Sequence, residues 1–145
     1  MIALIQRVSE ASISVDGEIR ASMGPGLLAL IGVTSGDESA STRRLLERML
    51  GYRVFPDSDG RMNRALREHG GGLLLVPQFT LAADTRRGTR PGFSTAAEPA
   101  RARQLFDELV GLARAAHPQV GCGEFGAHMQ VRLLNDGPVT FWLES

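Results

Sequence analysis

The sequence contains few cysteines, histidines or aromatic residues, and it carries no net charge. Cys122 is the single cysteine among 145 residues, so an internal disulfide is impossible and a reducing, cytoplasmic compartment is expected. Sixteen basic residues balance sixteen acidic residues, which argues against attraction of nucleic acid or membranes by long-range charge alone. The chain has no apolar run of about 18 residues and no signal-peptide pattern, so a soluble protein is expected.

Motifs for familiar cofactors are also missing. The chain has no GxxxxGK[ST], HExxH or GxSxG motif and no paired cysteines, so we expect neither a metal nor a cofactor. Its three histidines are His69 beside a glycine run, His117 at a predicted helix end and His128 before an apolar segment. These positions are more typical of surface or helix-terminal residues than of a catalytic base. A Ser-His-Asp arrangement therefore has little support.

Strand signals dominate the first part of the chain. Residues 2–8 and 11–15 are rich in β-forming residues, and the Asp-Gly pair at 16–17 is typical of a hairpin turn. After a turn at 24–26, the segment 27–33 reads LLALIGV. An almost wholly apolar run predicts a central strand that is covered on both faces.

Two helices are predicted between the strands. The first has Asp37 or Ser39 as its N-cap, and its apolar residues recur at helical spacing, at Leu45, Leu46, Met49 and Leu50. The second runs from Glu98 to Ala116, with Pro99 suited to its first turn. Its apolar stripe consists of Leu105, Leu109 and Leu112.

Further strands are expected within 70–84 and at 128–134 and 139–144. No repeat or linker interrupts the order of elements, and 43% hydrophobic residues suffice for one core, so residues 1–145 are predicted to form one domain. The mixture of hairpins and two crossover helices predicts a layered α/β protein.

The stretch VPQFTLAAD, residues 76–84, is unusual because Pro77 interrupts an apolar strand pattern. Proline cannot donate a hydrogen bond to a neighbouring strand, so the strand is expected to end, bulge or become an edge there. Such a break frees nearby main-chain N–H groups, and Gln78, Phe79 and Thr80 then become candidate donors to a ligand. An ordinary irregular strand remains the alternative.

The stretch DTRRGTRPGFS, residues 84–94, is a loop by composition. Its guanidinium groups, those of Arg86, Arg87 and Arg90, are suited to bidentate contacts with phosphate oxygens. A neutral protein would gain a local grip on a nucleic-acid backbone in this way. A solvated charged loop explains the same residues.

The segment NDGPVTFWLES, residues 135–145, opens with a Gly-Pro pair at 137–138. A turn before the last strand explains these residues, since Asn, Asp, Gly and Pro all favour turns. The pair also suits the presentation of two carbonyl oxygens to an ammonium group, because glycine has no side chain to obstruct them. Residue chemistry leaves both interpretations open.

Six stretches together resemble the D-aminoacyl-tRNA deacylases: ALIQRVSEASISVDG, GPGLLALIGVTSGD, YRVFPDSDGRMN, PQFTLAADTRRGTRPGFS, FGAHMQV and NDGPVTFWLES. The resemblance covers the whole chain, and QFTL and NxGPVT are signatures of that family. It implies a single-domain β-β-α sandwich of mixed, largely antiparallel sheets with two main helices. It further implies hydrolysis of the ester that joins a D-amino acid, or mischarged glycine, to the terminal adenosine of tRNA.

The resemblance also implies how chirality is read. In the family the Gly-Pro bond is cis, and the pair enters the active site of the other subunit of a homodimer. The carbonyls of Gly137 and Pro138 would then accept hydrogen bonds from the substrate α-ammonium, while Arg7 resembles the arginine that braces the pair. A rigid main-chain wall would exclude an L side chain by steric clash.

Catalysis in the family is ascribed to main-chain groups and to the tRNA. The N–H groups around Phe79 and Thr80, next to Gln78, would form an oxyanion site, and the terminal 2′-hydroxyl of tRNA would help to activate water. Thr80 as a nucleophile is the alternative, weakened by the lack of a neighbouring base. Phe125 and Met129 match positions that would hold the terminal adenine.

Two residues depart from the family pattern. Pro77 stands where serine is usual and is more typical of a related branch with relaxed chirality, whereas Phe79 follows the stricter branch. His128 replaces a usually acidic residue. A deacylase with relaxed chirality and a non-catalytic nucleic-acid-binding module of the same fold therefore remain alternatives to the D-specific enzyme.

Overall fold

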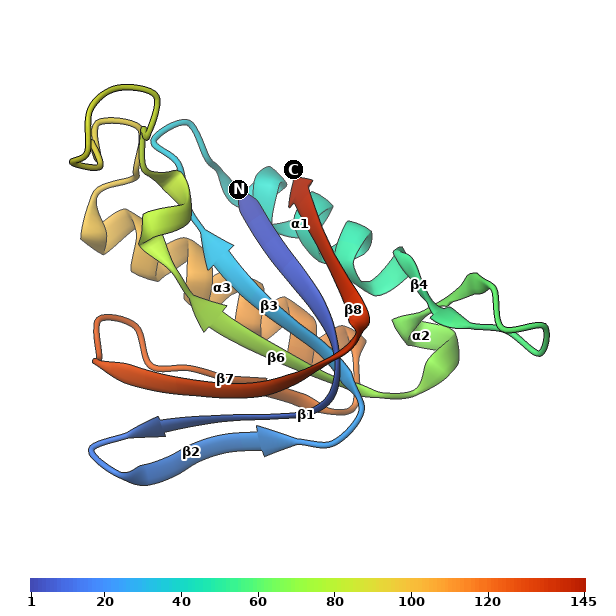
Figure 1. Cartoon of the computed structure of the whole chain (residues 1–145). Helices are drawn as coiled ribbons and strands as arrows, with labels where there is room; N and C mark the ends of the chain where they lie inside the picture. The colour runs from blue at the N-terminus through green and yellow to red at the C-terminus, as the bar shows by residue number, and fades with distance from the viewer.

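Two long paired strands organise the fold. In the computed structural model, which describes all residues 1–145, β1 (Ile2–Val15) pairs antiparallel with β8 (Met129–Glu144) from end to end. The first half of β1 also pairs with β3 (Gly26–Gly32), and its second half pairs with β2 (Glu18–Met23). The strand therefore contributes to two sheet regions. The chain ends lie side by side, since the Ser145 amide donates to the Met1 carbonyl (Figure 1).

The main sheet has the order β2-β1-β3-β6-β7, with β8 attached to β1. β6 (Gly72–Pro77) is parallel to β3 and to β7 (Val120–Cys122), whereas β1 pairs antiparallel with all of its neighbours. A parallel connection requires a crossover, and α1 (Ser39–Gly51) and α3 (Pro99–Ala116) provide the two crossovers. In Figure 1, α3 lies behind β3 and β6, and α1 lies behind β1 and β8.

Side-chain alternation on β3 and β6 produces two cores. One face packs against α1 and α3 and contributes Leu27, Ala29, Ile31, Leu73 and Leu75 to a cluster of 24 buried residues. The opposite face contributes Leu28, Leu74 and Val76 to a cluster of six that is completed by Val8, Ala11 and Ile13 of β1. Because both faces are covered, these strands are apolar throughout. The predicted β-β-α fold class is confirmed.

Close approach between β3 and β6 explains one glycine pair. A Cβ atom on Gly26 would lie 2.0 Å from the Gly72 carbonyl oxygen, which is far inside van der Waals contact. Only glycine lets the two strands start at this separation. The predicted hairpin turn is also present: Asp16 and Gly17 have φ of 52° and 82°. Two positive φ values match the turn that suits a two-residue hairpin.

The predicted helices exist with small differences at their starts. The second begins at Pro99, with Glu98 as N-cap, and ends at Ala116 as predicted. The first has Glu38 as its N-cap, so the prediction of Asp37 or Ser39 was wrong. Asp37 is buried and accepts hydrogen bonds from the Thr34 amide and hydroxyl and from the Met1 amino group. Its carboxylate stabilises the loop before the helix instead of the helix itself. None of the α-helices is long and apolar enough to cross a bilayer.

The remaining differences concern strands. The segments predicted at 2–8 and 11–15 form one strand, β1, and those at 128–134 and 139–144 form one strand, β8. The register between β1 and β8 shifts near their middles, but the pairing continues on both sides of the shift. In the sequence, this irregular part looks like a gap between two separate strands. Between α1 and β6 lie three elements without a prediction: β4 (Arg53–Pro56), β5 (Met62–Ala65) and α2 (Leu66–His69).

Candidate active site

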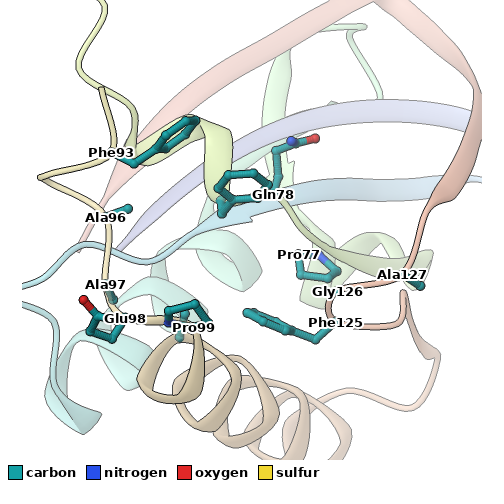
Figure 2. A pocket seen from close by; sticks show the side chains of 12 residues that line it. Pro77, Gln78, Phe93, Ala96, Ala97, Glu98, Pro99, Phe125, Gly126 and Ala127 are labelled. Atoms are coloured by element: carbon teal, nitrogen blue, oxygen red, sulfur yellow. The ribbon is translucent and has the colours of Figure 1, made fainter. Parts of the chain in front are cut away.

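A largely apolar cavity lies where β6 ends. It has a volume of about 610 Å³ and is bounded by the chain after β6, the segment that leads into α3 and the loop between β7 and β8. Figure 2 shows its lining, with Phe125 and Pro99 pointing toward each other. The lining residues are Pro77, Gln78, Phe79, Phe93, Ala96, Ala97, Glu98, Pro99, Ala102, Phe125, Gly126 and Ala127.

The strand β6 ends at Pro77, which is one of the three outcomes that the sequence predicts, and a short 3-10 helix, η1 (Phe79–Ala82), follows. The main-chain amide of Gln78 still donates to the Ile31 carbonyl of β3 at 2.7 Å, which fixes the point where the chain leaves the sheet. The Leu81 amide is the first to bond within the turn, to Gln78 at 3.2 Å. The amides of Phe79 and Thr80 have no acceptor within η1 because they precede that first bond.

Side chains around this break are arranged asymmetrically. The Gln78 amide nitrogen donates to Thr80 Oγ1 at 2.5 Å. Gln78 and Phe79 line the cavity, whereas Thr80 does not. The only partner of the Thr80 hydroxyl is an uncharged amide donor, and no histidine lines the cavity. The structure therefore provides no base for this hydroxyl.

Phe125 forms the wall nearest α3. Its ring packs 6.3 Å from that of Phe106, and the Arg103 guanidinium carbon lies 5.0 Å from its centroid. Arg103 also donates to the Phe125 carbonyl at 2.9 Å, so the helix holds both the ring and the main chain of this wall. Met129 does not line the cavity. A Cβ on Gly123 would lie 2.7 Å from Met129 Sδ and 3.2 Å from Pro77 Cδ, which places Met129 beside Gly123 and Pro77.

Phe93 is a lining residue that sequence reasoning missed. Its ring centroid is 5.1 Å from that of Phe79 with a tilt of 40°, and the two side chains remain 41% and 59% exposed. The residues that follow, Ala96 to Pro99, form the edge between Phe93 and Phe125. A lone phenylalanine at the end of an arginine-rich loop offers no periodicity from which this position follows.

The arginine-rich loop closes on itself beside the cavity. Asp84 and Gly92 exchange two main-chain hydrogen bonds of 2.7 and 2.9 Å. Side-chain hydrogen bonds from Arg86 lower the pKa of the Asp84 carboxyl, and Arg86 lies 2.8 Å from it. Arg87 and Arg90 are exposed and form no ion pair. Of the three candidate phosphate ligands, only these two are uncommitted.

Gly137 and Pro138 occupy a wide bulge in β8. Gln6 pairs with Thr140 and Val8 with Asn135, so the four residues 136–139 lie opposite one residue of β1, Arg7. The Gly137–Pro138 peptide bond is cis. Both residues are exposed, and neither lines the cavity of its own chain.

Arg7 and Asn135 hold the bulge from two sides. Arg7 donates from Nε to the Asp136 carbonyl at 3.0 Å and from Nη1 to the Val54 carbonyl at 2.6 Å. Asn135 accepts from the Val139 amide at 2.9 Å and donates to the Thr140 hydroxyl at 2.8 Å. The exposed tip of the bulge therefore stands on a fixed base.

The histidines have other surroundings. His117 is buried at the end of α3 and donates to the Gly71 carbonyl at 2.7 Å. His69 stacks on Phe55 with centroids 4.1 Å apart, and burial together with Arg64 and Arg7 lowers its pKa. His128 is exposed. No group of three or more His, Cys, Asp or Glu side chains comes together as a metal site.

Comparisons with known proteins agree on one family. A family model described as D-Tyr-tRNA(Tyr) deacylase matches residues 4–144. The chain is 65% identical over 144 residues to a D-aminoacyl-tRNA deacylase of Thioalkalivibrio sulfidiphilus, covering 99% of this chain and 97% of the relative. It is 60% identical over 145 residues to the D-aminoacyl-tRNA deacylase of Azotobacter vinelandii, covering both chains completely.

Solved structures share the fold. A protein described as c-Myc DNA Unwinding Element Binding Protein superposes with a TM-score of 0.96 at 33% identity, covering 100% of this chain and 99% of the other. A probable eukaryotic D-amino acid tRNA deacylase gives a TM-score of 0.87 at 17% identity, covering 99% and 98%. The second likeness concerns the fold alone.

Proposed function

Because this chain belongs to the D-Tyr-tRNA(Tyr) deacylase family, we propose that its cavity at the end of β6 binds the aminoacylated 3′ adenosine of tRNA and rejects L-amino acids. The chain is a hydrolase that acts on the ester bond of D-aminoacyl-tRNA. The enzyme is proposed to act in the cytoplasm.

The break after Pro77 is the observation that carries the proposal. It leaves the amides of Phe79 and Thr80 without an acceptor in η1, next to a largely apolar cavity. Ester hydrolysis places negative charge on the carbonyl oxygen, and such amides stabilise that charge when they are fixed in advance. Removal of one oxyanion donor typically costs about 100- to 1000-fold in rate.

Water activation is assigned to the terminal 2′-hydroxyl of the tRNA. No histidine lines the cavity, and Glu98 is the only charged residue among the lining residues. The Thr80 hydroxyl is bonded to the Gln78 amide instead of to a base. Protein side chains therefore position the substrate, and Phe125 and Met129 are proposed to hold the terminal adenine.

Chirality is proposed to be read by Gly137 and Pro138 of a partner subunit in a homodimer. Both residues are exposed at the tip of a bulge braced by Arg7, and they are absent from the lining of their own cavity. Insertion of the bulge into the cavity of a second copy of the chain would explain why its tip is both exposed and fixed. Their carbonyls would accept hydrogen bonds from the substrate ammonium, and the main chain would leave no room for an L side chain.

Steric exclusion predicts a broad substrate range. A pocket that selects by fit gains only about 1–3 kcal/mol per methylene, which is too little for near-complete chiral rejection. A wall that blocks one face of the α-carbon acts on every L side chain alike. Glycine presents no side chain to either face, so glycine mischarged onto tRNA is proposed as a second substrate.

Two alternatives have a specific observation behind them. Pro77, which replaces the usual serine, lines the cavity directly and favours the variant with relaxed chirality. The structural neighbour described as a DNA-unwinding-element-binding protein favours a nucleic-acid-binding role. The zero net charge of the chain counts against binding driven by charge alone.

Hydrolysis of matched esters separates the three possibilities. Purified protein is incubated with D-tyrosyl-tRNA, L-tyrosyl-tRNA and glycyl-tRNA, and release of the amino acid is followed. Release from the D and glycyl esters only is the expected result. Equal release from D and L esters would establish relaxed chirality, and binding of tRNA without release would establish the binding role.

The shared site is tested by sedimentation and by complementation. We expect a dimer at assay concentration. Two variants are each expected to be inactive: Gly137→Ala, which disrupts the bulge, and Phe125→Ala, which alters the cavity. Mixing them should restore activity, because each heterodimer carries one site with an intact cavity and an intact bulge. A monomer with full activity would contradict the partner's contribution.

A further inference from the structure

Phe79 and Phe93 form an aromatic pair at one end of the cavity. The pair faces the cavity on one side and solvent on the other. Their centroids are 5.1 Å apart, and 59% and 41% of the two side chains are exposed. Both line the cavity. Two neighbouring phenylalanines left in water at the edge of a binding site are the kind of exposed apolar surface that marks a contact with a ligand.

This pair is separate from the wall around Phe125. Phe125 is packed against Phe106 and covered by Arg103, whereas Phe79 and Phe93 contact no other ring or guanidinium. Figure 2 shows Phe93 and Phe125 on different sides of the cavity, with Phe93 on the segment before α3. The cavity therefore offers aromatic surfaces at two places, and the terminal adenine accounts for only one.

Positive charge adjoins the second place. Phe93 follows directly on the loop that the Asp84–Gly92 hydrogen bonds close. Arg86 is committed to Asp84, but Arg87 and Arg90 are exposed and unpaired. A flat apolar surface beside unpaired guanidinium groups is the combination that binds single-stranded nucleic acid, since bases stack on the rings and phosphates approach the cations.

We propose that the Phe79–Phe93 pair is a stacking site for the base of the nucleotide that precedes the terminal adenosine of tRNA, with Arg87 and Arg90 near the adjoining phosphates. This proposal rests on the proposed function. With the terminal base at Phe125 and the ester at the Phe79 amide, a strand that leaves the cavity beside the Phe79 ring would bring the preceding base to the pair. The 3′ end of tRNA is single-stranded, so the preceding base is free to stack.

Two substrates that differ by this base provide the test. One is the D-tyrosyl ester of adenosine, and the other is the D-tyrosyl ester of the trinucleotide CCA. Loss of base stacking on one aromatic residue typically weakens binding about tenfold. Phe93→Ala is expected to raise KM for the trinucleotide ester about tenfold with little change in kcat, and to raise KM for the adenosine ester several-fold less. Phe93→Trp should keep the wild-type KM ratio.

Three results would overturn the proposal. An equal rise for both esters would place Phe93 against the terminal nucleoside. A rise that differs between D-tyrosyl and D-alanyl esters would place it against the amino acid. A shift of the dimer-monomer equilibrium in Phe93→Ala would assign the pair to a second copy of the chain. Ile19→Ala, which removes an exposed apolar side chain of β2, is the matched control.

Binding measurements separate this proposal from the proposed function. The trinucleotide CCA, without an amino acid, and adenosine monophosphate are titrated into the wild type and into Phe93→Ala. Circular dichroism confirms that both proteins are folded. Tighter binding of CCA that disappears in the variant would support the stacking site even in a protein that hydrolyses neither ester. Equal affinity of the wild type for both ligands would exclude the stacking site even in an active deacylase.

Discussion

The guanidinium of Arg7 lies against Asp136: Nε donates to the main-chain carbonyl at 3.0 Å and is 3.2 Å from the carboxylate. The same side chain reaches Val54 on β4. One residue of β1 therefore connects the bulge of β8 to the β4–β5 hairpin. Only 14% of the Arg7 side chain is exposed, whereas the Asp136 side chain is 59% exposed. The main-chain contact is therefore the stronger tie.

Replacement of Arg7 by alanine is expected to impair both stability and activity. Hydrogen bonds that involve a charged group contribute about 1.5–3 kcal/mol, so the free energy of unfolding in urea should fall by that amount. A loosened bulge should lower kcat/KM for D-tyrosyl-tRNA about 100-fold, as misplacement of a positioning group does. Asp136→Asn keeps the carbonyl acceptor and should change stability by less than about 1 kcal/mol. Similar losses in both variants would contradict the dominance of the main-chain contact.

Thr80→Ala is expected to remain within about tenfold of the wild-type rate. The variant loses the hydrogen bond from Gln78 but keeps the main-chain amide that is proposed to stabilise the oxyanion. Loss of a true nucleophile typically costs more than about 10⁴-fold. Single-turnover hydrolysis of D-tyrosyl-tRNA decides between these values. Inactivity of Thr80→Ala together with full activity of Thr80→Ser would establish the hydroxyl as a participant.

Arg87→Ala and Arg90→Ala should weaken tRNA binding uniformly and make it less dependent on salt. Each lost phosphate contact should reduce the slope of log K against log salt by about 0.7–1. The double variant Asp84→Asn/Arg86→Ala removes a side-chain pair without changing net charge, and its slope should match the wild type. Filter binding between low and physiological salt provides the measurement. A larger effect from this double variant would place the phosphate near Arg86 instead.

Stability should decline at mildly acidic pH because of His69. Burial, followed by the charges of Arg64 and Arg7, lowers its pKa below the ordinary value of 6.5. The unfolded chain therefore binds this proton more readily than the folded one, so the contribution is present above pH 6.5 and is lost as the pH falls through the folded-state pKa. Urea unfolding of the wild type and His69→Gln between pH 8 and about 5 should differ in slope. Parallel curves would contradict the assignment.

Local patterns predicted most of the framework. The turn at Asp16-Gly17, the doubly covered strand β3 and the end of β6 at Pro77 each follow from one physical rule about φ, burial or a missing donor. The first helix cap was misassigned because Asp37 finds stronger partners than a helix end, the buried Met1 amine among them. The β4–β5 hairpin was missed because its strands are short and mostly exposed.

The site was only partly predictable. The structure brings Gln78, Phe79 and Phe125 to one cavity, and Phe93 joins them from a loop without any pattern. Arg86 looked equivalent to its neighbours in the sequence, yet Asp84 two residues earlier neutralises it. The bulge that presents Gly137 and Pro138 depends on the register between β1 and β8, and register is a long-range property.

β1 and β8 run through both sheet regions, the one that contains β3 and the one that contains β2, and this continuity affects how the protein unfolds. The two regions share β1 and β8, so separating the strands of one region would also break hydrogen bonds of the other. Amide protons at the two ends of β1 should therefore exchange with solvent in the same cooperative opening.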